Sequence, residues 1–508
     1  MTNRFTLNPG QLKIADLARL TAENTPIQLA EEALARIDSA NACVRQVLEN
    51  DKIVYGINTG FGSLANQIIS ANNLKQLQRN LILSHACGTG DLLDNGTARL
   101  LLLLKINSLA QGYSGVSLKL LNYLITFNNR SIIPCIPAKG SVGASGDLAP
   151  LAHMSLPLLG VGEVCHNGKI ISAEEGLAIA GLPVLELEPK EGLALINGLQ
   201  ASAAIAIQAY LNAEKLFNTA IIAGALSVDA ANGSDVPFDA RIHQAKGYRH
   251  QSEVAAWYRD LLAGSAIRES HRHCERVQDP YSLRCQPQIM GAVLHQMEFV
   301  KETLEIEANS VSDNPLIFPE QGEILSGGNF HGEMLAMASD NLALAIAEIG
   351  AAAERRIALL IDKNFSGLPA YLVKEGGLNS GFMIAHVTAA ACASDNKALA
   401  HPHSVDSLPT SANQEDHVSM ATNAARRLHA MIDNTATILA IELLAACQGL
   451  EFRKPLQTSS ALQKYYAEIR QNVPAYDQDR YFAPDIAVIK NKILQGDFKL
   501  DNVYNNAI

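Results

Sequence analysis

The chain has 508 residues, and 40 lysines and arginines against 51 aspartates and glutamates give a formal net charge of −11. Hydrophobic residues make up 48% and charged residues only 18%, which excludes a disordered chain. The acidic balance disfavours a nucleic-acid partner, which needs a basic face. A chain of this length buries about three quarters of its unfolded surface on folding, so a large core needs no disulfides.

The sequence favours a cytoplasmic protein without a membrane segment. Its first twenty residues show no apolar stretch followed by a small-residue cleavage site, so no signal peptide is expected. The densest apolar run, Leu100 to Leu104, ends at Lys105 and is far shorter than the ~20 residues that cross a bilayer. The eight cysteines are scattered without a C-x-x-C pair, which is typical of reduced thiols.

Glycine and proline interrupt the first 200 residues, where a helix is expected at 97–111 between two Gly-rich loops. Further along, apolar residues recur at helical spacing. The clearest stripe comprises Leu335, Leu342, Ile346, Ile349, Ala353 and Leu360. Long helices are predicted at 201–231, 287–311, 332–362 and 417–450. We therefore predict an all-α fold, with a loop-and-helix region at 1–200 and a long-helix bundle with a C-terminal helical cap at 201–508.

The first Gly-rich loop of chemical interest is Gly140-Ser-Val-Gly-Ala-Ser-Gly-Asp147. It lacks the Gly-Lys-Ser/Thr order of a phosphate-binding loop. The Gly146 amide nitrogen can attack the Ala144 carbonyl carbon, and loss of that oxygen and of the Ser145 hydroxyl as water gives a methylidene-imidazolone ring. Glycine at 146 removes the Cβ that would hinder this bend. The tripeptide alone is weak support, because a flexible loop has the same composition.

Two His-rich segments contain residue types that bind metals. His271-Arg-His-Cys274 and His401-Pro-His403 both lack zinc-ligand spacing such as H-E-x-x-H or C-x-x-C. No metal site is predicted from the sequence.

Seven separated motifs, in register over about residues 7–485, resemble those of the aromatic amino acid ammonia-lyase family, with the histidine-specific members most similar. They are Tyr55-Gly-Ile-Asn-Thr-Gly-Phe-Gly, Ser84-His85, Gly143-Ala-Ser-Gly-Asp-Leu-Ala-Pro150, Asn197-Gly-Leu-Gln, Gln278-Asp-Pro-Tyr-Ser-Leu-Arg-Cys-Gln-Pro-Gln288, Ser326-Gly-Gly-Asn-Phe-His331 and Asn413-Gln-Glu-Asp-His-Val-Ser419. This resemblance implies a mostly helical homotetramer with active sites shared between chains. It also implies non-oxidative deamination of L-histidine to trans-urocanate and ammonia, the first step of histidine degradation.

The resemblance also assigns residues. It implies that Ala144, Ser145 and Gly146 form the 4-methylidene-imidazol-5-one cofactor (MIO) without an external group. The other catalytic residues it implies are Tyr55 as the base for the β-proton, Tyr281 beside the cofactor, and Glu415. The substrate-binding residues it implies are His85, Asn197, Gln278, Arg284 and Phe330. A guanidinium fork at Arg284 suits a carboxylate, and Lys would be a poorer substitute.

Substrate choice is expected to depend on His85 and Glu415, because an imidazole offers one donor and one acceptor where a phenyl ring prefers apolar walls. A phenylalanine or tyrosine ammonia-lyase is therefore less favoured. An aminomutase that returns the ammonia stays open. A non-catalytic helical scaffold on the same fold is disfavoured, because Ser145 and Tyr55 are both present. Lys105 stands where many relatives have Arg, which affects fine tuning rather than the reaction class.

Overall fold

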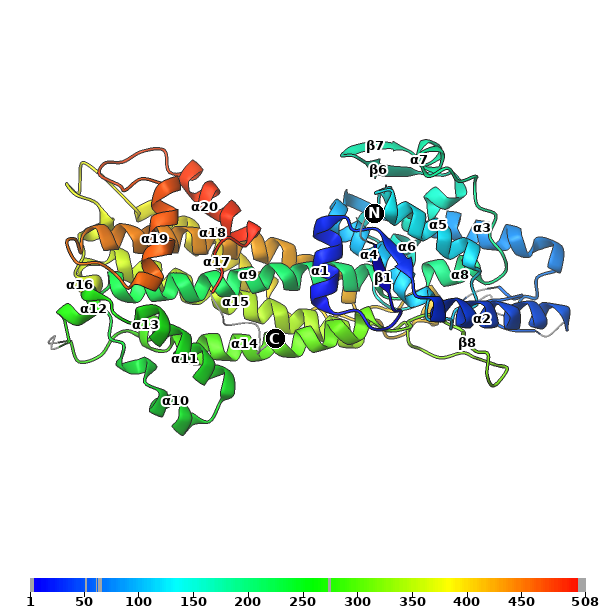
Figure 1. Cartoon of the computed structure of the whole chain (residues 1–508), viewed down its shortest axis with the longest axis horizontal. Helices are drawn as coiled ribbons and strands as arrows, with labels where there is room; N and C mark the ends of the chain where they lie inside the picture. Colours follow the sequence, from blue (N-terminus) through cyan, green and yellow to red (C-terminus); the bar gives the residue numbers. More distant parts are fainter. Residues whose placement is uncertain (1–3, 51–52, 61, 63–65, 273–275, 501–508) are drawn as a thin grey trace. The chain divides into compact units, whose positions relative to one another are not determined.

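A computed structural model of the chain describes residues 4–50, 53–60, 62, 66–272 and 276–500. Its internal contacts divide it into two compact units, which we describe separately (Figure 1). Unit 1 comprises Met1–Gln208, Lys301–Asp340 and Pro402–Arg426, and unit 2 comprises Ala209–Val300, Asn341–His401 and Arg427–Ile508. The sequence-based division near residue 200 stays a prediction.

Unit 1 combines short helices with small sheets and long loops. Its complete helices are α1 (Ile14–Glu23), α2 (Glu31–Glu49), α3 (Leu74–His85), α4 (Asn95–Leu109), α5 (Leu118–Asn129), α6 (Leu148–Ser155), α7 (Ala173–Ala180) and α8 (Glu191–Ile196). Several begin at side-chain caps: the Asp94 carboxylate accepts from the Thr97 amide at 3.0 Å, and Ser172 and Glu175 form a reciprocal capping box. The predicted helix at 97–111 corresponds to α4 and is buried along its length.

The strands of unit 1 are two to four residues long. They are β1 (Phe5–Leu7), β2 (Ile27–Leu29), β3 (Thr89–Leu92), β4 (Ile133–Pro134), β5 (Pro137–Lys139), β6 (Glu163–His166), β7 (Lys169–Ser172), β8 (Leu316–Phe318) and β9 (Glu323–Leu325). β1 and β2 pair in parallel, whereas β3–β5, β4–β6–β7 and β8–β9 are antiparallel. The sequence showed no signal for them, because segments this short present no alternating pattern.

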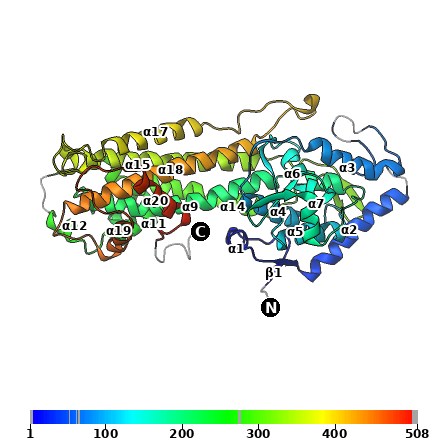
Figure 2. The same ribbon diagram turned by 90° about the horizontal axis from the view of Figure 1, so that it is seen from above.

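Among the described residues, every named strand lies in unit 1, and unit 2 consists of helices joined by loops. It contains α10 (Ala240–Lys246), α11 (Arg249–Leu262), α12 (Ala266–Ser270), α13 (Tyr281–Arg284), α16 (Lys363–Ser366), α17 (Met383–Leu399), α19 (Ser460–Asn472) and α20 (Ala483–Gln495). Four longer helices have residues in both units: α9 (Gln200–Ala230), α14 (Gln286–Ala308), α15 (Glu333–Ile361) and α18 (Ala421–Glu451) (Figure 2). These four confirm the predicted long helices, and the predicted stripe on α15 is buried at all six positions.

A buried ion pair links three of these helices within unit 2. The Arg356 guanidinium on α15 donates to the Glu442 carboxylate on α18 at 2.5 and 2.9 Å, and the Ser227 hydroxyl on α9 donates to the same carboxylate at 2.8 Å. Both charged side chains are almost completely buried. Removal of either partner would leave an uncompensated buried charge, which is strongly destabilising.

One described helix, α18, is long and apolar enough to cross a membrane. Of its most apolar window, 78% is buried inside the protein, as expected of a core helix. The seven described cysteines are free thiols.

Candidate active site

The loop that contains Ala144, Ser145 and Gly146 bends at two glycines. Gly143 has φ +64° and Gly146 has φ +87°, in the left-handed region that favours glycine. A Cβ on Gly146 would lie only 2.4 Å from the Gly198 nitrogen and 2.5 Å from its carbonyl oxygen. Both obstacles are backbone atoms, so position 146 requires glycine, as the cyclisation chemistry also does.

Segments distant in sequence hold this loop in place within unit 1. The Met420 amide donates to the Val142 carbonyl at 2.8 Å. The Gly143 carbonyl accepts both the Gly332 amide at 3.1 Å and the Ser419 hydroxyl at 2.8 Å. Ala144 is buried in a small apolar cluster with Val418 and Met420. The loop is therefore anchored to the segments that precede α15 and α18.

Asp147 is the main polar anchor of the loop. Its fully buried carboxyl accepts from the Ser141 hydroxyl at 2.7 Å, the Ser202 amide and hydroxyl at 2.7 Å each, and the Thr422 hydroxyl at 3.0 Å. Its own amide donates to the Gly198 carbonyl at 2.7 Å. The carboxyl thus ties the loop to the starts of α9 and α18.

The structure brings Ser145 and Glu415 together across 270 residues of sequence. The Ser145 hydroxyl donates to Glu415 Oε1, and the Thr410 hydroxyl donates to Glu415 Oε2 at 2.5 Å. A β-bridge between Thr410 and Glu415 fixes the local backbone. The predicted cofactor serine and the predicted specificity carboxylate therefore lie in direct contact.

Asn197 ends α8 one residue before Gly198, which pairs with Gly146 in a parallel bridge. Its side-chain nitrogen donates to the Asn314 carbonyl at 3.0 Å, and its own carbonyl accepts from Lys105 Nζ at 2.6 Å. Burial lowers the pKa of Lys105 to about 7. Asn197 is thus held from both its side chain and its backbone, next to the cofactor loop.

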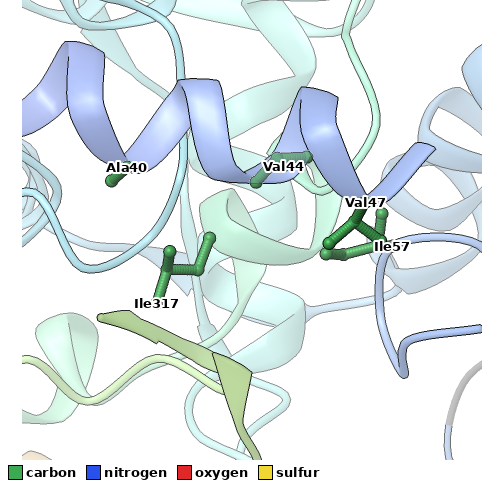
Figure 3. Close-up of a cluster of buried hydrophobic side chains, with 5 residues drawn as sticks. All are labelled: Ala40, Val44, Val47, Ile57 and Ile317. Carbon is green, nitrogen blue, oxygen red and sulfur yellow. The ribbon is translucent and has the colours of Figure 1, made fainter. Parts of the chain in front are cut away.

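Tyr55 lies in a turn that packs on α2. Figure 3 shows Ala40, Val44 and Val47 of α2 against Ile57, two residues after Tyr55, and Ile317 of β8. The half-buried Tyr55 hydroxyl accepts a long bond of 3.5 Å from the Gly62 amide. A Cβ on Gly56 would lie 2.6 Å from a Leu193 methyl, which explains glycine beside the tyrosine. Phe61 of the same motif lies outside the described residues.

His85 is the last residue of α3, and its Nδ1 lies 3.0 Å from the Ser84 hydroxyl. Burial lowers its pKa, which favours the neutral imidazole. Phe330 is half-buried in the turn before α15. The contacts described for this unit include none between Ser145 and His85, Phe330 or Tyr55. Unit 1 therefore brings Ala144, Ser145, Gly146, Asn197 and Glu415 together, and it also contains Tyr55, His85 and Phe330.

The remaining predicted site residues belong to unit 2. Tyr281 and Arg284 share the single-turn helix α13, with the Arg284 guanidinium carbon 4.8 Å from the Tyr281 ring centre. Their spacing of three residues places the two side chains on the same side of this helical turn. The Arg284 Nε is buried without a hydrogen-bond partner among the described residues, and Tyr281 is 68% exposed. Gln278 is exposed, next to Asp279, whose carboxylate accepts from the Ser234 amide at 2.6 Å.

Sequence reasoning missed the residues that support the site. In the sequence, Asp147 is only a member of the Gly-rich motif, and Lys105 is only a departure from the relatives. Nothing in the sequence indicates the second buried pair, Lys190 with Asp313 at 2.7 Å. No local signal identifies such groups, because their partners lie far away in sequence.

Comparison with known proteins shows the family of the chain. The family model described as aromatic amino acid lyase matches residues 12–471. The chain belongs to this family.

Three relatives show how similar the chain is to individual members of the family. The chain is 70% identical to a curated histidine ammonia-lyase of Legionella pneumophila strain Lens, covering 99% of this chain and 100% of that protein. The crystal structure of histidine ammonia-lyase from Trypanosoma cruzi matches with a TM-score of 0.90 at 38% identity, covering 99% and 96% of the two chains. The tyrosine aminomutase of Streptomyces globisporus matches with a TM-score of 0.92 at 33% identity, covering 98% of each.

Proposed function

We propose that this chain is an ammonia-lyase that removes ammonia from L-histidine without oxidation to give trans-urocanate. The similarity at 70% identity to a curated histidine ammonia-lyase over nearly the whole chain supports this substrate. The contact of Ser145 with Glu415 is the structural observation that supports it best, because it joins the cofactor loop to a polar group suited to an imidazole.

The loop fits the cofactor MIO. Gly146 is held in a bend that backbone atoms of Gly198 deny to any other residue, and the small Ala144 is buried beside it. MIO supplies an electrophile that ordinary side chains do not offer. Loss of the Ser145 hydroxyl as water also removes the hydrogen bond it makes to Glu415. The Glu415 carboxylate then has an acceptor oxygen free for a substrate N–H.

The remaining roles are proposed for this chain's own side chains. The Arg284 guanidinium, with its unpaired Nε, binds the substrate carboxylate, assisted by Asn197 and Gln278. His85 and Glu415 pair with the two imidazole nitrogens, and Phe330 walls the pocket. Tyr55 takes the β-proton as general base in its phenolate form and becomes the phenol, and Tyr281 stands beside the cofactor. A neutral His85, favoured by its lowered pKa, can both accept and donate.

Incubation of the pure chain with L-histidine tests the proposal through the ultraviolet absorbance of urocanate. L-Phenylalanine and L-tyrosine run in parallel, and the products are separated by chromatography. Urocanate and equimolar ammonia from histidine alone support the proposal. A β-amino acid product would favour an aminomutase, and turnover of phenylalanine or tyrosine without histidine would contradict the substrate.

We further propose a cytoplasmic homotetramer whose sites combine residues of several chains. The chain's membership of the aromatic amino acid lyase family supports this proposal, because the resemblance implies sites that several chains share. Co-refolding inactive Ser145→Ala with inactive Tyr55→Phe should restore roughly a quarter of the sites if ring and base come from different chains. No recovery in confirmed mixed tetramers would contradict sharing.

A further inference from the structure

Two histidines and a glutamate meet beside the cofactor loop in unit 1. They are His331 in the turn before α15, Glu333 at the start of α15, and His417 in the segment before α18. One ligand atom from each lies within 4.8 Å of the other two. The ring centres of His331 and His417 are 5.6 Å apart, with the planes inclined by 32°. These residues form a three-ligand cluster that the sequence did not reveal.

The hydrogen bonds leave donor atoms of this cluster free. His331 Nε2 lies 3.1 Å from the His417 carbonyl oxygen, and because a carbonyl cannot donate, this nitrogen carries the proton. In the neutral ring, His331 Nδ1 therefore has a free lone pair. Glu333 Oε2 is buried without a hydrogen-bond partner among the described residues. A bound cation would supply the partner that this oxygen lacks.

Two imidazoles and one carboxylate are a ligand set that zinc and its first-row neighbours accept, with a fourth position left to water. Ligands about 2.0–2.1 Å from zinc in a tetrahedron are about 3.4 Å from one another. The present spacing of up to 4.8 Å must therefore close by up to about 1.4 Å for the three atoms to share one ion. A carbonyl hydrogen bond that fixes the tautomer of a ligating imidazole is a usual outer-shell arrangement.

A positive charge already occupies the other such cluster that the described residues form. The other cluster is His250, His295 and Glu298 in unit 2. There the Arg249 guanidinium lies 2.5 Å from Glu298 Oε1 and 2.8 Å from His250 Nε2, so a positive charge already occupies these ligands.

We propose that His331, Glu333 and His417 form a binding site for one divalent first-row cation of the zinc class. The cation ties the segment that includes Glu415 to the start of α15. The anchors of the cofactor loop at Gly332 and Ser419 adjoin the same two segments. This site goes beyond the proposed elimination of ammonia and does not depend on it.

Binding of Co²⁺ and Zn²⁺ to the full-length protein, first stripped with a chelator, tests the proposal. Co²⁺ should give visible absorption typical of imidazole and carboxylate ligands, Zn²⁺ should displace it, and calorimetry should find one equivalent per chain. His417→Asn and Glu333→Gln should each weaken Zn²⁺ binding by more than about tenfold, the loss already typical of an outer-shell partner. His295→Asn is the matched control and should bind as the wild type does.

Zn²⁺ should also raise the melting temperature of the wild type and of His295→Asn, but not of Glu333→Gln, whose shape is conserved. Circular dichroism checks that each variant is folded. Absence of the Co²⁺ absorption would overturn the proposal. So would binding that survives in Glu333→Gln and His417→Asn, or that is lost in His295→Asn. None of these measurements depends on turnover of histidine.

Discussion

Replacement of Asp147 tests how the cofactor loop is held. Its buried carboxyl accepts four hydrogen bonds, three on Oδ1 from the hydroxyls of Ser141, Ser202 and Thr422, and one on Oδ2 from the Ser202 amide. A net value of about 0.5–1.5 kcal/mol for each bond gives a loss of about 4 kcal/mol for Asp147→Ala. Such a loss is at the high end for a single substitution.

Asp147→Asn is the matched control for this prediction. With its carbonyl oxygen in the Oδ1 position it keeps the three hydroxyl bonds. Its amide nitrogen then faces the Ser202 N–H, so two donors meet where a donor met an acceptor. We expect a cost of about 1–3 kcal/mol, the penalty of an unmade buried bond. Asp147→Asn should therefore lie between the wild type and Asp147→Ala.

Urea unfolding, followed by far-ultraviolet circular dichroism, gives the stability order of the three proteins. Intact-mass spectrometry of the same samples reports whether the loop has lost water. We expect Asp147→Ala to be the least stable and to keep its encoded mass, because the loop loses its main anchor. An Asp147→Ala protein within about 0.5 kcal/mol of the wild type and with a complete ring would refute the reasoning.

Three further predictions follow from the site. Tyr55→Phe should form the ring but lose about 10²–10⁴ in kcat, the usual cost of a lost general base, and a change within about twofold would remove Tyr55 from that role. His85→Leu combined with Glu415→Gln should collapse kcat/KM for histidine, since unmade polar contacts cost about 1–3 kcal/mol each, and an unchanged value would refute the specificity assignment. Burial lowers the pKa of Lys105 to about 7 in the folded protein, whereas it is 10.5 in the unfolded chain. Between pH 7 and pH 10.5 the unfolded chain therefore binds more protons, so the free energy of unfolding rises with pH. Lys105→Met should lower that slope by up to about 1.4 kcal/mol per pH unit in urea unfolding, and parallel slopes for the two proteins would contradict it.

The fold was predictable where periodicity is strong. The predicted stripe from Leu335 to Leu360 lies along α15 and is buried. It was predictable because apolar residues at helical spacing over a 29-residue segment distinguish a helix from a strand. The nine short strands were not predictable, since two to four residues carry no alternating pattern. Their pairings depend instead on contacts such as β1 with β2, which lie about twenty residues apart.

The site was predictable where its chemistry depends on residues that are adjacent in the sequence. Ala144, Ser145 and Gly146 are adjacent, and the glycine requirement at 146 follows from the bend. Three features could not be predicted from the sequence: the Ser145–Glu415 contact, the four hydrogen bonds at Asp147, and the cluster at His331. Each joins residues separated by tens to hundreds of positions, and only the folded backbone brings them together.

The central claim is that the backbone of this loop becomes the reactive group. Mass spectrometry of the peptide that contains residues 144–146, from wild type and from Ser145→Ala, tests it most directly. The wild-type peptide should be lighter than its encoded mass by two water molecules, and the Ser145→Ala protein should fold, show the encoded mass and be inactive. An unmodified wild-type peptide in fully active protein would contradict the account.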